Sequence, residues 1–193
     1  MSDRRTVAVF GLGNPGEGYR TTRHNVGFMA ADAVMQRLGI QVRHRSMTYV
    51  AGEGSIGNSD VVIVKPLTFM NNSGYAVEQA LGWYGLHPER ALIISDDVAL
   101  PLGTVRVRPK GTHGGHNGLR SVIECLGTVE FPRIRCGIRN PGYESSLDLA
   151  EYVLAPFEDS ERTRVEEMVT RAAEAAIVFV AEGIEETMNR FNT

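Results

Sequence analysis

The clearest indication of the fold comes from residues 7–16, VAVFGLGNPG. Its four apolar residues stop at the first of three glycines, which is typical of a short buried strand that ends in a tight turn. Further on, residues 24–38 place apolar side chains at helical spacing, and Gly39 supplies a natural C-terminal stop. A strand followed by a turn and a helix is the opening unit of an α/β fold.

The rest of the chain continues this alternation. Apolar runs and alternating positions predict further strands at 47–56, 60–64, 91–95, 103–108 and 134–138, and helical spacing predicts helices at 72–84, 118–126 and 159–183. Residues 57–59, Gly-Asn-Ser, join two of these strands as a hairpin connection, so part of the sheet is antiparallel. We therefore expect residues 1–193 to form a single-domain three-layer α/β/α fold around a central mixed, mostly parallel twisted sheet. The turn-rich segment 140–146 is predicted to be a surface loop.

The composition is that of an ordinary globular protein. The chain has 193 residues, 42% of them hydrophobic and 22% charged, and its formal net charge is −3, so overall charge indicates no particular partner. Its two cysteines, Cys125 and Cys136, are too few for a disulfide framework or a thiolate zinc site, which favours a reducing compartment. We find neither a signal peptide nor an apolar run of about 18 residues. We expect a cytoplasmic monomer without membrane contact.

The net charge differs strongly between two segments of the chain. Residues 101–140 contain seven basic and two acidic residues, a net +5, whereas residues 141–193 contain four basic and twelve acidic residues, a net −8. Such a division allows one part of the surface to bind an anion while the rest repels polyanions. The alternative is a set of solvated arginines on ordinary strands.

The glycines of residues 11–16 also match the dinucleotide-binding pattern G-x-G-x-x-G. That site requires a helix that begins at the third glycine and an acidic residue at the end of the next strand. Here residues 17–22 intervene, Pro15 stiffens the turn, and Asp32 lies inside the predicted helix. The stretch favours a turn that brings backbone groups and the Asn14 amide close to a substrate.

His24 begins the first predicted helix, and Asp96 directly follows the predicted strand 91–95. Both positions belong to the edge where α/β proteins bind ligands. A carboxylate that accepts the N–H of an imidazole fixes its tautomer and strengthens it as a base, so the two residues are a candidate dyad. Alternatively, His24 is a surface or capping histidine and Asp96 a turn residue.

Residues 113–118, HGGHNG, form a second glycine-rich segment. Two histidines three positions apart could bind a metal, but the glycines between them and the lack of a third ligand nearby argue against this. Exposed amide groups at paired glycines instead favour close approach to a phosphate or a substrate backbone. The catalytic motifs G-x-S-x-G, G-x-x-x-x-G-K-[ST] and H-E-x-x-H are missing, which leaves water as the leading nucleophile.

Together these motifs resemble bacterial-type peptidyl-tRNA hydrolases, over essentially the whole chain. The residues that carry the resemblance are GLGNPG at 11–16, Tyr19, TRHN at 22–25, PLTFMN at 66–71, SG at 73–74, SDD at 95–97 and GGHNGL at 114–119. Each motif alone is weak, but chance does not account for their number, order and spacing.

The resemblance implies hydrolysis of the ester between a peptide and the 3′-terminal ribose of tRNA, without a metal or cofactor. It implies that His24 activates water, that Asp96 orients His24, and that Asn71 helps to hold the water. The implied substrate cleft is lined by Asn14, Tyr19, Met70, Asn71, Gly115, His116 and Asn117. The implied contacts with the 3′ CCA end and acceptor stem of tRNA come from Arg106, Arg108, Lys110 and Arg135.

The sequence departs from the family at two positions near Asp96. Ser95 and Ala99 stand where the family often has His and Asp, which weakens any role for a second carboxylate. Two alternatives remain: an RNA-binding paralogue of the same fold without turnover, and a nucleotide-dependent oxidoreductase built on the first glycine turn. The retained His24 and Asp96 favour the hydrolase.

Overall fold

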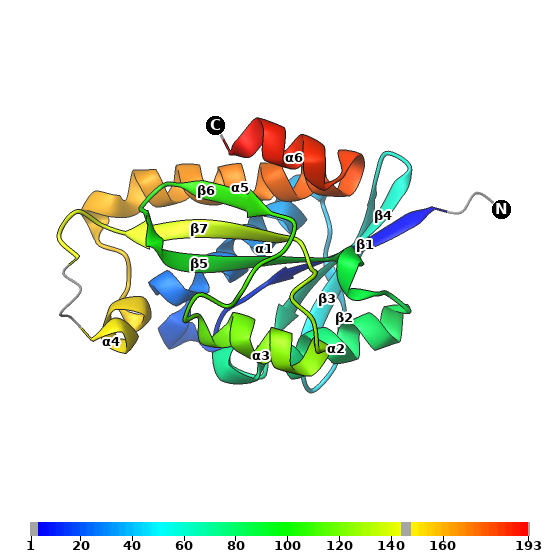
Figure 1. Ribbon diagram of the computed structural model, residues 1–193, viewed down its shortest axis with the longest axis horizontal. Helices are drawn as coiled ribbons and strands as arrows, with labels where there is room; N and C mark the ends of the chain where they lie inside the picture. The colour runs from blue at the N-terminus through cyan, green and yellow to red at the C-terminus, as the bar shows by residue number, and fades with distance from the viewer. Residues whose placement is uncertain (1–3, 144–147, 193) are drawn as a thin grey trace.

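A seven-stranded sheet runs through the part of the chain that the computed structural model describes, residues 4–143 and 148–192 (Figure 1). The strand order is β2-β3-β4-β1-β5-β7-β6. The strands are β1 (Arg5–Gly11), β2 (Val42–Arg45), β3 (Tyr49–Ile56), β4 (Ser59–Pro66), β5 (Ala91–Pro101), β6 (Val105–Arg108) and β7 (Arg133–Arg139).

The centre of the sheet is parallel and its edges are antiparallel. Strands β4, β1, β5 and β7 run parallel to one another, whereas β2, β3 and β6 pair antiparallel with their neighbours. The expected hairpin is confirmed, with β3 and β4 in register from Tyr49↔Pro66 to Ile56↔Ser59. The predicted mixed sheet is therefore confirmed, with its parallel pairing confined to the four central strands.

Helices cover both faces of the sheet (Figure 1). They are α1 (Val26–Leu38), α2 (Ser73–Tyr84), α3 (Asn117–Leu126), α4 (Leu149–Leu154), α5 (Arg162–Glu182) and α6 (Ile184–Phe191). Because successive side chains of a strand point to opposite faces, Val7 and Val9 of β1 pack in the core beneath α1 and α5, while Ala8 and Phe10 pack in the core beneath α2 and α3. The three-layer prediction is confirmed. None of the helices within residues 4–143 and 148–192 has the length and apolar character that a membrane crossing needs.

One strand, β2, and two α-helices, α4 and α6, were not predicted. The sequence of β2, VRHR, is short and largely polar, so it shows no apolar alternation. The six residues of α4 are too few for a helical period to stand out. The predicted helix 159–183 is in fact a 3-10 turn followed by α5, and Gly183, with φ of 94°, separates α5 from α6. Residues 144–146 of the predicted surface loop lie outside the described residues.

One predicted boundary was wrong in a way that affects the site. The strand expected to end at Ser95 continues to Pro101 as β5, so Asp96 and Asp97 lie inside it rather than after it. Pairing with β7 extends the strand, since Asp96 faces Cys136 and Asp97 faces Gly137 in the parallel register. Asp96 is thereby held by strand hydrogen bonding and not by a turn.

Helix α1 crosses the sheet so closely that position 27 requires glycine. A Cβ atom on Gly27 would lie 2.4 Å from the carbonyl oxygen of Leu12 and 2.5 Å from that of Ile94. These are backbone atoms of a packed sheet and cannot move aside independently. The close approach places the start of α1 against the ends of β1 and β5.

Gly27→Ala is expected to lower the free energy of unfolding by about 3 kcal/mol, because the added methyl group overpacks a rigid contact. Gly82→Ala is the matched control: this α2 glycine has nothing within 4 Å of its would-be Cβ, so the change should be neutral or stabilise by about 0.5–1 kcal/mol. Urea unfolding followed by circular dichroism measures both values. Equal midpoints for Gly27→Ala and the unchanged protein would contradict the expectation.

Candidate active site

The predicted catalytic residues meet at the carboxyl edge of the parallel strands. Asn14 follows β1, Asn71 follows β4, and Asp96 lies in the adjacent strand β5. His24 comes from the 3-10 turn η2 (Arg23–Asn25), immediately before α1. Open α/β sheets bind ligands at this edge, because the turns after the strands leave a crevice there.

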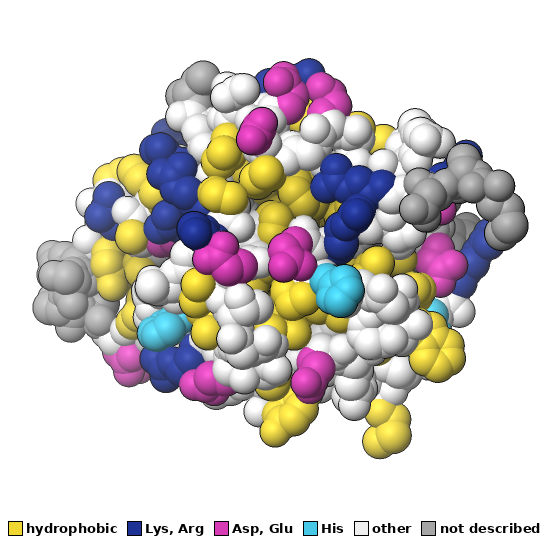
Figure 2. All heavy atoms as spheres, turned by 45° about the vertical axis from the view of Figure 1, so that its right-hand side comes forward, with side chains coloured by type: hydrophobic (Ala, Val, Ile, Leu, Met, Phe, Trp, Pro, Cys, Tyr) yellow, Lys and Arg dark blue, Asp and Glu magenta, His cyan; other side chains and the backbone are white. Residues whose placement is uncertain are grey.

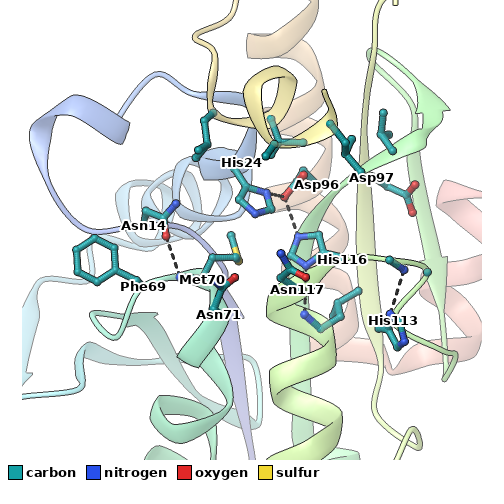
Figure 3. A pocket seen from close by; sticks show the side chains of 18 of the residues that line it. Asn14, His24, Phe69, Met70, Asn71, Asp96, Asp97, His113, His116 and Asn117 are labelled. Atoms are coloured by element: carbon teal, nitrogen blue, oxygen red, sulfur yellow. Dashed lines mark hydrogen bonds and ion pairs between the residues drawn. The ribbon is translucent and has the colours of Figure 1, made fainter. Parts of the chain in front are cut away.

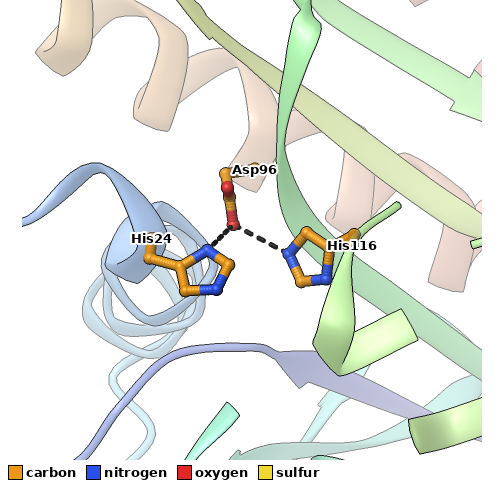
Figure 4. Close-up of side chains that lie close together, drawn as sticks. All are labelled: His24, Asp96 and His116. Atoms are coloured by element: carbon orange, nitrogen blue, oxygen red, sulfur yellow. Dashed lines mark hydrogen bonds and ion pairs between the residues drawn. The ribbon is translucent and has the colours of Figure 1, made fainter. Parts of the chain in front are cut away.

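Asp96 accepts hydrogen bonds from two histidines (Figure 4). Nδ1 of His24 lies 2.8 Å from Oδ1 of Asp96, and Nε2 of His116 lies 2.9 Å from the same oxygen. The centroids of the two rings are 4.9 Å apart, and Asp96 is 4% exposed. The predicted contact between His24 and Asp96 is present in the structure, whereas the second histidine on Asp96 was not predicted.

The hydrogen-bond partners determine the tautomers of both histidines. His116 is the N-cap of α3, where its Nδ1 accepts from the backbone N–H of Leu119 at 3.2 Å. An accepting ring nitrogen carries no proton, so neutral His116 is protonated on Nε2 and donates to Asp96. Nδ1 of His24 also donates to the carboxylate, which only accepts. In the neutral ring, Nε2 of His24 is left with a free lone pair.

The two imidazoles keep Asp96 ionised. Burial alone would raise the pKa of this carboxyl, but the charges and hydrogen bonds of His116 and His24 outweigh burial and hold the pKa well below its usual range. Because the pKa is lowered on folding, the stability that Asp96 contributes is present above the unfolded carboxyl pKa of roughly 4. That stability declines as the pH falls below the unfolded value, and it is gone once the pH is below the lower folded value.

The same three side chains bring their ligand atoms within 4.8 Å of one another, close enough to surround a metal ion. Coordination through Nε2 of His116 would require that nitrogen to lose its proton, and in a neutral ring Nδ1 would gain it. The hydrogen bond that caps α3 at Leu119 would then be broken. The local geometry therefore favours the hydrogen-bonded arrangement over metal binding.

The Asn14 amide is fixed in one orientation. Its Oδ1 accepts from the backbone N–H of Met70 at 2.7 Å. Its backbone is held by Asn25, whose side chain accepts from Asn14 N–H at 2.8 Å and donates to the Asn14 carbonyl oxygen at 2.9 Å. The Asn14 NH₂ group is consequently available to the cleft as a donor (Figure 3).

These groups line a cleft of about 580 Å³, a volume within the range of small-molecule sites. Figure 3 shows the amides and histidines around it, which come from the turn after β1, from η2 and η3 (Met70–Asn72), and from the start of α3. All the substrate residues predicted from the sequence lie in its wall: Asn14, Tyr19, Met70, Asn71, Gly115, His116 and Asn117. The opposite wall is apolar and comes from α4, through Leu149, Ala150, Val153 and Leu154.

Sequence reasoning missed Phe69 and the α4 wall. Phe69 has φ of 59°, the only positive φ outside glycine among the described residues, and its ring packs edge-on against Tyr19 with centroids 6.2 Å apart. A bulky residue held in this conformation is a mark of functional sites. Phe69 lies in the PLTFMN motif, so the sequence could have identified it as a cleft residue. The α4 wall could not be identified in this way, because six residues are too few to show a helical period.

The predicted RNA-contacting cations lie on and beside β6 and β7, and none lines the cleft. Arg106 and Arg135 are direct register partners on these strands. Arg135 also donates to Asp97 at 2.5 Å, and Lys110 pairs with Glu130 at 3.1 Å. Figure 2 shows one face of the molecule, on which Lys and Arg side chains form separate groups divided by acidic and apolar ones.

The structure contradicts the dinucleotide interpretation of residues 11–16. Two short 3-10 turns separate Gly16 from α1, so the helix does not begin at the third glycine as that site requires. Asp32 lies in α1 and pairs with Lys65 at 2.5 Å.

Comparison with known proteins gives one consistent result. The peptidyl-tRNA hydrolase family model matches residues 8–193. Peptidyl-tRNA hydrolase of Thermoanaerobacter sp. (strain X514) is 44% identical over 184 residues, 95% of this chain and 98% of the relative, and that of Brevibacillus brevis is 44% identical over 185 residues, 96% and 97%. The crystal structure of peptidyl-tRNA hydrolase from Acinetobacter baumannii superposes with a TM-score of 0.89 at 31% identity, over 100% of this chain and 98% of the other. The chain therefore belongs to the peptidyl-tRNA hydrolase family.

Proposed function

We propose that the cleft hydrolyses the ester between the peptide and the 3′-terminal ribose of peptidyl-tRNA, with His24 as the base that activates water. The observation that supports this most directly is the hydrogen bond from Nδ1 of His24 to Asp96, because in the neutral ring it leaves Nε2 of His24 without a proton at the cleft. Family membership supplies the substrate class.

In this mechanism Nε2 of His24 takes a proton from a water as the water oxygen attacks the ester carbonyl carbon. Asp96 stabilises the resulting imidazolium, to which it is already hydrogen-bonded. The tetrahedral intermediate then breaks its bond to the ribose oxygen, which receives the proton back from His24. The products are a peptide carboxylic acid and a tRNA with a free 3′-terminal hydroxyl group, and the base is regenerated.

The neutral amides position the substrate. Asn14 offers an NH₂ group whose orientation is fixed by Met70, and Asn71 and Asn117 reach the cleft from η3 (Met70–Asn72) and from the first turn of α3. A donor fixed in advance beside the developing oxyanion supplies about 10²–10³ in rate without changing the charge of the base. We assign water-holding to Asn71 and contact with the tRNA end to Asn117.

Arg106, Arg108, Lys110 and Arg135 are proposed to bind phosphates of the CCA end and acceptor stem. Like charges directly opposite each other on a sheet repel, as Arg106 and Arg135 do here, and a phosphate between them would relieve the repulsion. Arg135 is partly neutralised by Asp97, and Lys110 by Glu130. Arg106 is therefore the cleaner residue for testing phosphate contact.

Arg106→Gln is expected to weaken binding of N-acetyl-aminoacyl-tRNA and to reduce the slope of log K against log salt concentration by about 1, because one counterion fewer is released. Filter binding between low and moderate salt measures the slope, with His24→Ala present in every protein compared so that the ligand is not cleaved. The control is Arg37→Gln, since Arg37 pairs with Glu174 between α1 and α5. The same slope in Arg106→Gln and the unchanged protein would remove this arginine from the phosphate contacts.

The reaction itself is tested by release of deacylated tRNA from N-acetyl-aminoacyl-tRNA, with unblocked aminoacyl-tRNA as the comparison substrate. Cleavage of the blocked ester is the expected result. Binding of the blocked substrate without cleavage would instead support the RNA-binding paralogue that keeps the fold without turnover.

A further inference from the structure

Arg23, the residue before His24, is buried in a cluster that the proposed reaction does not use. Its side chain is 3% exposed, and Nη2 donates to Oε2 of Glu161 at 2.7 Å. Nη1 donates to the carbonyl oxygen of Pro156 at 2.5 Å, and the guanidinium carbon lies 4.6 Å from the ring centroid of Tyr152. A buried cation is tolerated only with such partners, so they restrict Arg23 to one position.

The cluster connects the turn that carries His24 to helix α4. Tyr152 belongs to α4, and the chain that leaves α4 is bonded to the His24 turn through the backbone. The N–H of Arg23 donates to the carbonyl oxygen of Ala155 at 3.0 Å, and the N–H of Phe157 donates to that of Thr21 at 3.1 Å. The His24 turn is therefore joined to α4 and the segment after it by backbone hydrogen bonds and by the side chain of Arg23.

Glu161 is held as firmly as Arg23. Its Oε2 also accepts from the backbone N–H of Glu158 at 2.7 Å, and its Oε1 accepts from Nδ2 of Asn140 at 3.1 Å. The side chain is 7% exposed. The ion pair thus joins the end of β7, the start of α5 and the His24 turn at one buried point.

The cleft side of α4 is apolar, through Leu149, Ala150, Val153 and Leu154. Leu149 and Leu154 are 42% and 43% exposed, which leaves apolar surface open inside a cleft that is otherwise lined by amides and histidines. Exposed apolar surface in a concave site marks contact with an apolar ligand group.

We propose that Arg23, through its ion pair with Glu161, is a positioning residue that holds the α4 wall against the His24 turn, and that this wall binds an apolar side chain on the ester-linked amino acid. The inference rests on the proposed function. Ribose and phosphate groups of the tRNA end are polar and need hydrogen-bond partners, which the four α4 side chains do not offer. A nucleobase binds best by stacking on an aromatic ring or a guanidinium group, and the four aliphatic side chains offer neither. The amino-acid side chain next to the ester is the part of this substrate that can be apolar and still lie near His24.

Glu161→Gln tests whether the ion pair with Arg23 positions the α4 wall, and it changes the shape of the side chain very little. It removes the charge that fixes Arg23, and the Asn140 amide can turn over to accept from the new NH₂ group. The measurement is kcat/KM for N-acetyl-leucyl-tRNA and N-acetyl-glycyl-tRNA, at a temperature where circular dichroism shows the variant fully folded. The ratio of the leucyl to the glycyl value is expected to fall by about tenfold, as for a lost apolar contact. Glu174→Gln, which removes the charge from the surface pair with Arg37, is the control and should leave the ratio unchanged.

A purely structural role for the ion pair would lower both kcat/KM values by the same factor, and an unchanged ratio in Glu161→Gln would overturn the proposal. Arg23→Lys, which keeps the charge but not the two-sided contact with Pro156 and Glu161, should shift the ratio in the same direction. Leu154→Ala alters an exposed side chain that makes no contact in the ion pair, and it should also lower the ratio. A leucyl preference that survives this change would equally overturn the proposal. Failure of the proposed function is distinguishable, because the unchanged protein would then cleave neither substrate.

Discussion

His24→Ala is expected to lower kcat for N-acetyl-aminoacyl-tRNA by about 10²–10⁴-fold, the contribution of a well-placed general base. The reason is local. Nε2 of His24 has a free lone pair only because Asp96 holds the proton on Nδ1, and alanine leaves no group to take the proton of the attacking water. Single-turnover release of deacylated tRNA at saturating enzyme isolates this step from binding.

Binding of the substrate should change little in His24→Ala, because the amides and the β6–β7 cations remain. The control is His87→Ala, since His87 is an exposed histidine that caps the turn before β5, away from the carboxyl edge of that strand. A rate for His24→Ala within a few-fold of the unchanged protein, with normal binding, would show that another group activates the water.

The central layers could be predicted because their signals are local. Apolar runs such as residues 7–10 and the spacing in 24–38 reflect burial on both sides of a sheet and on one side of a helix. The edge strand β2 and the helices α4 and α6 were missed because short or half-polar segments acquire their structure from the elements against which they pack. Their sequences show no regular spacing of apolar residues that would predict a strand or a helix.

The sequence predicted which residues lie around the cleft, but it did not predict which of their side chains contact one another. His24 and Asp96 were placed at one edge by the rule for strand ends, and they are in contact. The role of His116 depends on α3 beginning at Asn117, since only an N-cap position makes its Nδ1 an acceptor and its Nε2 a donor to Asp96. Likewise, Arg23 lies 138 residues from Glu161, and no sequence period connects the two.

Asp96→Asn is expected to lower kcat by about 10²–10⁴-fold, by analogy with the loss of the carboxylate from other His–Asp catalytic pairs. The amide is nearly isosteric, so the strand and the cleft should persist. If its oxygen faces the two rings, His24 keeps its tautomer but the imidazolium that forms during water attack loses its negative partner. If its NH₂ group faces them instead, Nδ1 of His24 must accept, and the proton moves to Nε2, where it blocks the base.

The neighbouring carboxylate provides the matched control for this change. Asp97→Asn removes a charge that pairs with Arg135 and touches neither imidazole, so its effect should fall on KM and on salt dependence, with a much smaller loss in kcat. The lowered pKa of Asp96 also predicts that the unchanged enzyme does not lose activity through protonation of this carboxylate until the pH falls well below the usual range of carboxyl pKa values. A kcat for Asp96→Asn no lower than that for Asp97→Asn would refute the pairing of His24 with Asp96 as the source of the base.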